Sequence, residues 1–444
     1  MTIVSSVFSG KRYAVLGLAR SGLATVECLA ASGARVTAWD AREEARAAVA
    51  DKAELADPLA IDLAGYDGVV VSPGIPLNRH PIADHARKAG VPLIGDIELF
   101  ALARPTLPAH RVVGITGTNG KSTTTALIHH IIETAGIPTR MGGNIGLPIL
   151  GQEPLPEGGI YVLELSSYQI DLTHNLDCDV AVLLNVTPDH LDRHGGFEGY
   201  AAAKARLFAM QSDTHARVIA LDDETTRAIA APLANVTGVH AASVSADEQA
   251  RWPALQGPHN AQNAVVARAV ATALGIEPAT IERGLESYAA LPHRMERVCE
   301  IDGVLYVDDS KATNAASTAP ALGAWPAVAG KPRIHWIVGG LPKSDRLDEC
   351  EPYYPNIKAA YTIGEAGPMF AELLRPHMPV DESEMLSTAV RRAARAARPG
   401  DIVLLSPACA SFDQFRDFEA RGDAFIAAVA ALSDGAGDDE RSGA

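Results

Sequence analysis

The sequence predicts three α/β domains, each built on a largely parallel sheet. Apolar runs typical of buried strands alternate with Ala-rich helical segments along most of the chain. Its 444 residues are too many for one core, and its 47% hydrophobic content is enough for several. We expect a Rossmann-like domain over 1–100, a central P-loop ATPase-like domain over 101–293, a second Rossmann-like domain over 294–432 and a disordered tail over 433–444.

Composition excludes several classes of protein. The 38 basic residues are outnumbered by 54 acidic ones, and the net charge of −16 argues against a nucleic-acid partner. No apolar run is long enough for a membrane span, and the N-terminus lacks the segments of a signal peptide, so we expect no membrane partner. Five scattered cysteines without a CxxC pair indicate a reducing, cytoplasmic setting and argue against a structural zinc site.

The first domain begins as a βαβ unit. Residues 12–18 read as a buried strand, an Ala-rich helix follows, and the next strand ends at Asp40. The turn between the first strand and the helix, Gly17-Leu-Ala-Arg-Ser-Gly22, is weaker than GxGxxG, so it favours another phosphate compound over a dinucleotide. A further strand runs into Pro73-Gly74-Ile75-Pro76, at the sheet edge where ligands usually bind. Residues 99–110, with two prolines, read as the linker to the second domain.

A phosphate-binding loop opens the second domain. The segment 111–124, RVVGITGTNGKSTT, joins an apolar strand to a glycine-rich turn and a helix. Glycines let backbone N–H groups approach an anion, and the helix N-terminus adds its positive end. Lys121 would neutralise the outer phosphates, and the Ser122 hydroxyl would contact Mg²⁺. The general P-loop pattern requires Gly where this chain has Ile115, but the GxxGKS that begins at Gly117 still predicts an ATP site.

Further polar residues of the second domain are candidates for the same ATP site as the phosphate loop. Glu164 lies inside the apolar strand YVLEL, where a carboxylate is costly unless it is paired. A salt bridge would account for it, but the phosphate loop favours Mg²⁺. His190 follows the next strand, and Lys204 lies among alanines on a helix, where a solvated lysine is the ordinary interpretation. Asn260 and Asn263 are spaced to share one face at the start of a later helix.

The third domain repeats this organisation. A strand pair around Gly303 ends in DDSKATN (308–314), and the last strand runs into SPACASFDQF (406–415). Between them, a strand over 334–340 is followed by Lys343, and a helix is expected over 386–398. Polar side chains therefore follow several strands of this sheet, which predicts a second ligand-binding edge.

Eight blocks of sequence together resemble the Mur ligases of peptidoglycan synthesis. They are GTNGKST, LELSSYQ, NVTPDHLDRH, YAAAKARLF, GPHNAQN, LPHRME, DDSKATN and SPACASFDQF. The resemblance extends from about residue 12 to residue 425, and DDSKATN, SPACASFDQF and the chain length are similar to the branch of the family that adds D-glutamate.

The resemblance implies an ATP-dependent ligase that forms an amide bond. The γ-phosphoryl group of ATP would pass to the carboxylate of UDP-N-acetylmuramoyl-L-alanine (UDP-MurNAc-L-alanine), and the amine of D-glutamate would then displace phosphate. A free carboxylate does not form an amide at neutral pH because its oxygen is a poor leaving group. Transfer between two anions requires charge neutralisation, which Lys121 and two Mg²⁺ ions would provide.

The resemblance also assigns residues to ligands. The implied ATP contacts are Gly117, Thr118, Asn119, Gly120, Lys121, Ser122, Thr123, Asn260, Asn263, Arg294 and Asp309. The implied metal ligands are Ser122, Glu164, His190 and Lys204, and the catalytic set is Lys121, Glu164, His190 and Lys204. The implied contacts of the UDP-linked substrate are Ala19, Arg20, Asp40, Ala41, Arg42, Ser72, Pro73, Gly74 and Asn144. Those of D-glutamate are Lys311, Thr313, Lys343, Ser411, Phe412 and Phe418.

Lys204 would act as a carbamate, formed from CO₂ on its amine. A free lysine is a cation and does not bind Mg²⁺, whereas a carbamate offers anionic oxygens. We further expect a monomer whose domains close about hinges near residues 100 and 294.

Alternative functions stay open at this point. One is a sibling Mur ligase or a folylpolyglutamate-type ligase that uses another amino acid, L-glutamate included. A second is an NAD-dependent oxidoreductase built on the first domain, and a third is a non-catalytic ATP-binding switch. The third predicts that Lys204 is dispensable.

Overall fold

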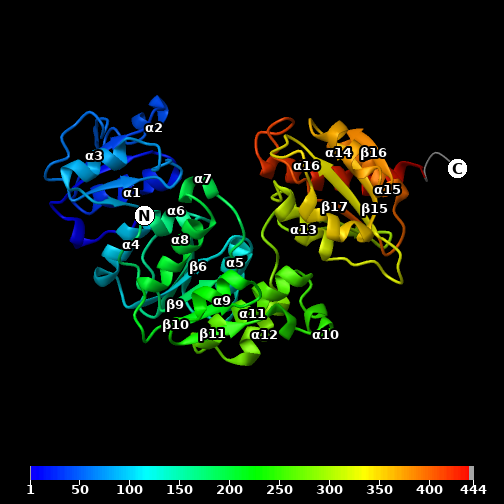
Figure 1. Cartoon of the computed structure of the whole chain (residues 1–444), viewed down its shortest axis with the longest axis horizontal. Helices are drawn as coiled ribbons and strands as arrows, with labels where there is room; N and C mark the ends of the chain where they lie inside the picture. The colour runs from blue at the N-terminus through cyan, green and yellow to red at the C-terminus, as the bar shows by residue number, and fades with distance from the viewer. Residues whose placement is uncertain (1, 440–444) are drawn as a thin grey trace. The chain divides into compact units, whose positions relative to one another are not determined.

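The computed structural model describes residues 2–439, with side chains described as far as residue 432. The chain forms two compact units, Met1–Ser243 with Gln262–Leu285, and Val244–Ala261 with Glu286–Ala444. The first unit holds two sheets and the second holds one (Figure 1). Three α/β sheets confirm the predicted fold class. None of the described helices combines the length and apolar character that a membrane span requires.

The first sheet is parallel, with the strand order β3-β2-β1-β4-β5. Its strands are β1 (Arg12–Leu16), β2 (Arg35–Trp39), β3 (Glu54–Leu55), β4 (Gly68–Val71) and β5 (Leu93–Ile94). The accompanying helices are α1 (Arg20–Ala31), α2 (Glu43–Ala47) and α3 (Ile82–Ala89). Val15 packs with Leu29 of α1 on one face, and Leu16 packs with Ile82 of α3 on the other. Because both faces are covered, the central strands β1 and β4 are almost entirely apolar, as a doubly wound sheet requires.

The second sheet is also parallel, with the order β11-β10-β9-β6-β8-β7. Its strands are β6 (His110–Thr116), β7 (Thr139–Gly143), β8 (Gly159–Glu164), β9 (Val180–Leu183), β10 (Ala216–Ala220) and β11 (Val236–Val239). Its helices include α5 (Lys121–Thr134), α6 (Ser167–Asp171), α7 (Leu191–His194), α8 (Phe197–Ala209) and α9 (Glu224–Ala230). Strand β6 lies between β8 and β9, so the phosphate loop, Glu164 and the residues after β9 meet at one edge.

The third sheet has the order β12-β13-β17-β14-β15-β16, and only β12 is antiparallel to its neighbour. Its strands are β12 (Glu296–Ile301), β13 (Val304–Asp308), β14 (Ile334–Gly339), β15 (Ile357–Ile363), β16 (Val380–Glu384) and β17 (Ile402–Leu405). Its helices are α13 (Ala315–Gly323), α14 (Gly367–Leu374), α15 (Leu386–Ala396) and α16 (Phe418–Asp439). One core joins the sheet to α13 and α14, and the other joins it to α15 and α16, so the fold is again doubly wound.

Three segments differ from the sequence expectation. The expected linker 99–110 begins inside helix α4 (Asp96–Ala103), because Leu99 and Phe100 are fully buried in the core. Residues 214–256 have the pattern of strand and loop in the sequence, but they also hold helices α9 and α10 (Ala246–Ala250). The helix expected over 257–275 is present as α11 (Pro258–Ala273), and a further helix, α12 (Pro278–Ser287), follows it. The tail expected to be disordered over 433–444 lies in α16 as far as Asp439, and the rest of it lies outside the described residues.

Candidate active site

The phosphate loop between β6 and α5 depends on glycine at two positions. Gly120 has a φ of +82°, and a Cβ there would lie 2.5 Å from Oδ1 of Asn263. A Cβ on Gly117 would lie 2.9 Å from Cβ of Leu184. Glycine at both positions lets the loop approach the neighbouring strand and helix. Helix α5 then begins at Lys121, so its positive end faces the loop.

Asn185, which follows β9, holds the loop in this conformation. Its Oδ1 accepts hydrogen bonds from the backbone N–H groups of Thr118 (3.1 Å) and Asn119 (2.8 Å). Its Nδ2 donates to the carbonyl of Asn119 and to Oε1 of Gln262, both at 3.1 Å. Sequence analysis assigned Asn185 no role, although a polar residue directly after a buried strand is the signal that marked His190.

Two lysines converge on the loop. Nζ of Lys121 donates to the carbonyls of Gly117 (2.9 Å) and Thr118 (2.8 Å), and Nζ of Lys204 donates to the same Gly117 carbonyl at 2.7 Å. Lys204 is only 1% exposed, and its Nζ lies 4.5 Å from the ring centroid of Tyr200. Burial, together with the nearby charge of Lys121, lowers the pKa of Lys204 to about 6. The Lys204 amine is therefore mostly neutral at pH 7 and available as a nucleophile, which the solvated-lysine interpretation did not anticipate.

Glu164 at the end of β8 has the environment of a cation ligand. The residue is 2% exposed, and its Oε1 accepts a hydrogen bond from Nδ2 of Asn144 at 2.8 Å. Its Oε2 is buried without a hydrogen-bond partner among the described residues. An unpaired buried carboxylate oxygen is costly, so this atom fits the ligand position expected for Mg²⁺. The buried Ser122 hydroxyl at the start of α5 supplies a second oxygen of the required kind.

His190 lies in the loop between β9 and α7. It has a φ of +51° and its ring centroid is 5.0 Å from that of Tyr168. Its Nε2 lies 3.5 Å from Oδ2 of Asp189. The left-handed backbone at a non-glycine residue is uncommon and is typical of residues placed for function.

A cleft of about 270 Å³ in the first unit is lined by some of these groups. The predicted residues that line it are Pro73, Gly74, Lys121, Asn144, His190 and Lys204. Sequence analysis did not assign the other lining residues, Ser166, Ser167, Tyr168, Asp189 and Tyr200. The cleft therefore brings loops of the first sheet against the phosphate loop, Lys204 and His190.

Two further pockets lie along the first sheet. One, of about 300 Å³, is lined by Ala19, Arg20, Pro73 and Asn144 from the predicted set, together with Ser21, Asp96, Gly143, Gly146, Pro148 and Gln169. Another of about 300 Å³ is lined by Asp40 and Ala41 together with Leu16, Gly17, Trp39, Asp57, Leu59, Ile75 and His80. Of the residues predicted for the UDP-linked substrate, these two pockets thus hold Ala19, Arg20, Asp40, Ala41, Pro73 and Asn144, whereas Arg42 and Ser72 line neither.

Asp40, at the end of β2, anchors the turn after β1. Its Oδ2 accepts from the backbone N–H of Leu18 at 2.7 Å, and its Oδ1 accepts from Nε of Arg42 at 3.1 Å. The hydrogen bonds from Arg42 lower the pKa of Asp40 to about 2, so the carboxylate stays charged. Ser72 closes the same region by donating from Oγ to the carbonyl of Gly17 at 3.0 Å.

The residues predicted for the amino acid gather on loops of the third sheet. Nζ of Lys343 donates to Oγ1 of Thr313 at 3.0 Å, and Nζ of Lys311 lies 4.0 Å from the ring centroid of Phe418. Ser411 is buried, whereas Phe412 is 69% exposed. These loops follow β13, β14 and β17, which are neighbours in the sheet, so these residues lie at one edge of it, and their binding of a ligand stays a prediction.

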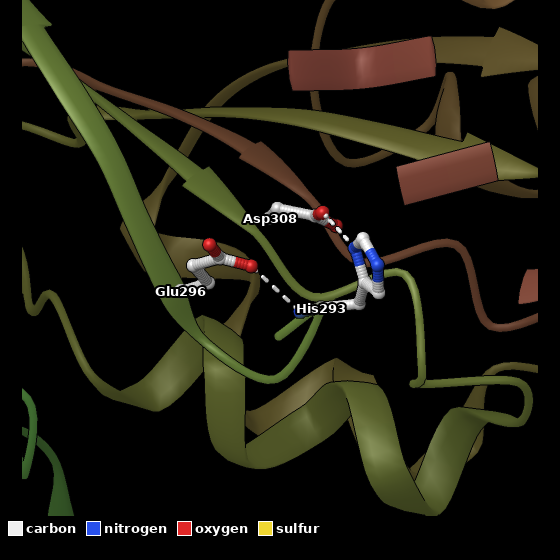
Figure 2. A group of neighbouring side chains, drawn as sticks. All are labelled: His293, Glu296 and Asp308. Carbon is white, nitrogen blue, oxygen red and sulfur yellow. Dashed lines mark hydrogen bonds and ion pairs between the residues drawn. The ribbon is translucent and has the colours of Figure 1, made fainter. Parts of the chain in front are cut away.

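The turn that carries Arg294 is held by its neighbours. Figure 2 shows the ring of His293 turned toward Asp308, while Glu296 points to the backbone of the same turn. Nδ1 of His293 lies 2.7 Å from Oδ2 of Asp308, and the backbone N–H of His293 donates to Oε2 of Glu296 at 2.7 Å. The potential ligand atoms of His293, Glu296 and Asp308 lie close enough to hold a cation, but their hydrogen bonds already engage these residues in fixing the turn.

Asp309 lies behind this turn. Its Oδ1 accepts from the backbone N–H of Met295 (3.2 Å) and its Oδ2 from Oγ of Ser406 (2.7 Å). Burial raises its pKa to about 7. Both carboxyl oxygens are used inside the second unit, so the ribose contact implied for Asp309 stays a prediction. Asn260 likewise donates to the carbonyl of Gln256 at 3.1 Å within this unit.

Three family models match the chain. A model described as "Mur ligase MurD-like, N-terminal domain" matches residues 11–95, the "Mur ligase middle domain" matches 115–256, and the "Mur ligase, glutamate ligase domain" matches 293–409. A relative from Novosphingobium aromaticivorans, named UDP-N-acetylmuramoylalanine–D-glutamate ligase, is 68% identical over 435 residues, which are 97% of this chain and 97% of that protein. This chain belongs to the Mur ligase family.

Other Mur ligases are similar to this chain in sequence or in fold. A protein of the same name from Zymomonas mobilis is 59% identical, over 97% of this chain and all of that one. The structure is also similar to that of MurF ligase from Thermotoga maritima in complex with ADP, with a TM-score of 0.59, 15% identity and 96% of each chain covered. At that identity the likeness shows the shared three-domain fold.

The family membership confirms the resemblance on which the site residues were assigned, while the individual roles stay predictions. The structure brings together the predicted metal ligands with Lys121 in the first unit, and the predicted amino-acid contacts in the second. It adds groups that the sequence did not reveal, such as Asn185 and Tyr200, because their contacts are made with residues far away in the chain.

Proposed function

We propose that this Mur ligase joins D-glutamate to UDP-MurNAc-L-alanine with hydrolysis of ATP, in the synthesis of peptidoglycan precursors. The observation that carries this proposal is the 68% identity to a protein named for the reaction, extended over 97% of both chains. The cleft supports this chemistry, because Lys121 of the phosphate loop and Lys204 line it, and the buried carboxylate of Glu164 is hydrogen-bonded to Asn144 of the same lining. Since ATP and a UDP-linked sugar are cytoplasmic compounds, we place the reaction in the cytoplasm.

The phosphate loop would hold the β- and γ-phosphates of ATP. The backbone N–H groups at the start of α5 point to one site, and Lys121 adds a positive charge. Asn185 keeps Thr118 and Asn119 in the conformation that this cradle requires. Pre-organised donors of this kind stabilise the charge that spreads over the transferred phosphoryl group.

The donor set at the edge of the second sheet fits Mg²⁺. Ser122 and Glu164 would hold one ion, and His190 with a carbamate on Lys204 would hold a second. Bound there, the ions would neutralise the phosphate oxygens and the substrate carboxylate. The unpartnered Oε2 of Glu164 supports this assignment, because a cation would satisfy a buried anionic oxygen.

The burial of the Lys204 amine supports the proposed carbamate. Only an unprotonated amine attacks CO₂, and burial lowers the Lys204 pKa to about 6. The new N–C bond converts the amine into an anion as a proton leaves. That anion would lie beside Lys121, whose positive charge would then favour it instead of opposing an ammonium group.

The Lys311 and Lys343 loops of the third sheet would bind D-glutamate. A dicarboxylate is matched by two cations, one facing each carboxylate. Its amine would attack the acyl carbon, the C–O bond to phosphate would break, and inorganic phosphate would leave. Because the acyl phosphate is formed before the amine attacks, closure that excludes water would protect it from hydrolysis.

An amino-acid panel tests the assignment. We expect ADP release to depend on UDP-MurNAc-L-alanine and D-glutamate together, because each supplies one partner of the amide bond. Release should be measured with D-glutamate, L-glutamate, L-alanine, a diamino acid and a dipeptide, and with a folate acceptor as a control for the sibling ligases. Turnover with L-alanine or a diamino acid but not with D-glutamate would remove the assignment. The monomeric state stays a prediction, which sedimentation of the purified chain would check.

A further inference from the structure

Arg421 on helix α16 is an arginine in the interior of the second unit. Its side chain is 1% exposed. Nε donates to Oγ of Ser310 at 2.9 Å, and Nη2 donates to the carbonyl of the same residue at 2.8 Å. Nη1 donates to the carbonyls of Cys409 (3.1 Å) and Ala410 (3.2 Å). All three guanidinium nitrogens are therefore engaged by protein oxygens.

These acceptors belong to two loops that follow neighbouring strands. Ser310 lies after β13, directly before Lys311, and Cys409 and Ala410 lie after β17, directly before Ser411. The two strands are paired, with Asp308 opposite Leu405. One guanidinium group thus bridges the loop that carries Lys311 and the loop that carries Ser411.

The residues that Arg421 contacts are themselves hydrogen-bonded to the other predicted substrate-binding segments. Ala410 and Leu341 exchange backbone hydrogen bonds of 2.9 and 3.0 Å. These bonds connect the loop that leads to Lys343 with the loop that carries Ser411. Oγ of Ser310 donates to the carbonyl of Phe418 at 2.8 Å, which fixes the first residue of α16. The residues predicted to contact the amino acid are therefore neighbours in sequence of the atoms that Arg421 holds.

The arrangement suits arginine and no other side chain. Burial lowers the pKa of Arg421 to about 10, so the group is still charged at neutral pH. A planar fork donates in several fixed directions at once, whereas an ammonium group on a flexible stem does not. A buried cation is retained at a cost in desolvation, which four hydrogen bonds to oxygen offset here.

We propose that Arg421 is a positioning residue for the amino-acid substrate: it sets the spacing between the Lys311 loop and the Ser411 loop and thereby the affinity for the dicarboxylate. Arg421 itself lies behind the site and touches no substrate. The inference rests on the proposed function, because that function assigns the amino acid to these loops.

The test separates the two half-reactions. Arg421→Lys is expected to raise the KM for D-glutamate about tenfold or more, because the charge is kept and the fork is lost. The KM values for ATP and UDP-MurNAc-L-alanine are expected to stay within about twofold of wild type. Without amino acid, hydroxylamine should trap the acyl phosphate as a hydroxamate at the wild-type rate, because the first half-reaction does not use these loops.

Two further variants complete the experiment. Ser310→Ala removes one acceptor of the bridge and is expected to raise the KM for D-glutamate about threefold or more. Arg416→Ala, at a position whose side chain is 81% exposed, is the matched control and should change nothing. If Arg421→Lys does not fold, the KM values of Ser310→Ala for D-glutamate, ATP and UDP-MurNAc-L-alanine test the positioning role instead.

The outcomes are distinct. A KM for D-glutamate within about twofold of wild type in the deciding variant, or an equal rise in all three KM values, would overturn the positioning role. Failure of the wild-type enzyme to form any hydroxamate from UDP-MurNAc-L-alanine and ATP would instead overturn the proposed function.

Discussion

Lys204→Ala is expected to lose nearly all ligase activity, and acetate or another short-chain carboxylate is expected to restore part of it. The variant removes the proposed carbamate, and a small carboxylate can supply an anionic oxygen in the space that the side chain leaves. The residue is buried against the phosphate loop at the Gly117 carbonyl, so the loss occurs next to the transferred phosphate. ADP release, measured with and without the carboxylate, is the readout.

An exposed lysine on a helix provides the control for this variant. Lys88→Ala in α3 should leave activity unchanged, because that side chain is exposed on the surface of the first sheet domain. Full activity of Lys204→Ala without any added carboxylate would contradict the carbamate proposal, because it would show that Lys204 is dispensable.

Lys121→Ala is expected to lower turnover by about 10³-fold or more, since that is the typical worth of charge stabilisation in phosphoryl transfer. Nζ of Lys121 donates to the loop carbonyls of Gly117 and Thr118, so its positive charge lies at the phosphate loop. Saturating ATP separates an effect on turnover from one on binding, so kcat is the quantity to measure. A loss smaller than about tenfold would contradict the assigned role.

Most of the strands and helices were predictable from the sequence because their apolar runs and glycine turns agree with the final fold, whereas helices α10 and α12 and the end of α4 were not predicted. Gly117, Gly120 and Lys121 mark the start of α5 through local backbone requirements alone. Glu164 was predictable for a similar reason, since a carboxylate inside an apolar strand needs a partner. These features depend on a few adjacent residues, which a single sequence displays directly.

The burial of Lys204 could not be predicted from the residues around it in the sequence. Its alanine-rich surroundings suggest a solvated helix face, yet the structure buries it to 1% exposure against a loop 87 residues away. Only the family resemblance pointed to its role. The resemblance did not indicate Asn185 or Arg421, because the roles proposed for them rest on hydrogen bonds to residues 66 and 111 positions away, respectively.

The fate of one oxygen atom tests the central claim most directly. UDP-MurNAc-L-alanine with ¹⁸O in its alanyl carboxylate should be incubated with ATP, D-glutamate and the enzyme, and the inorganic phosphate analysed by mass spectrometry. Transfer of the γ-phosphoryl group to the carboxylate predicts phosphate that carries one ¹⁸O atom for each amide formed. Unlabelled phosphate, with the amide still produced, would contradict an acyl phosphate and with it the account of the cleft.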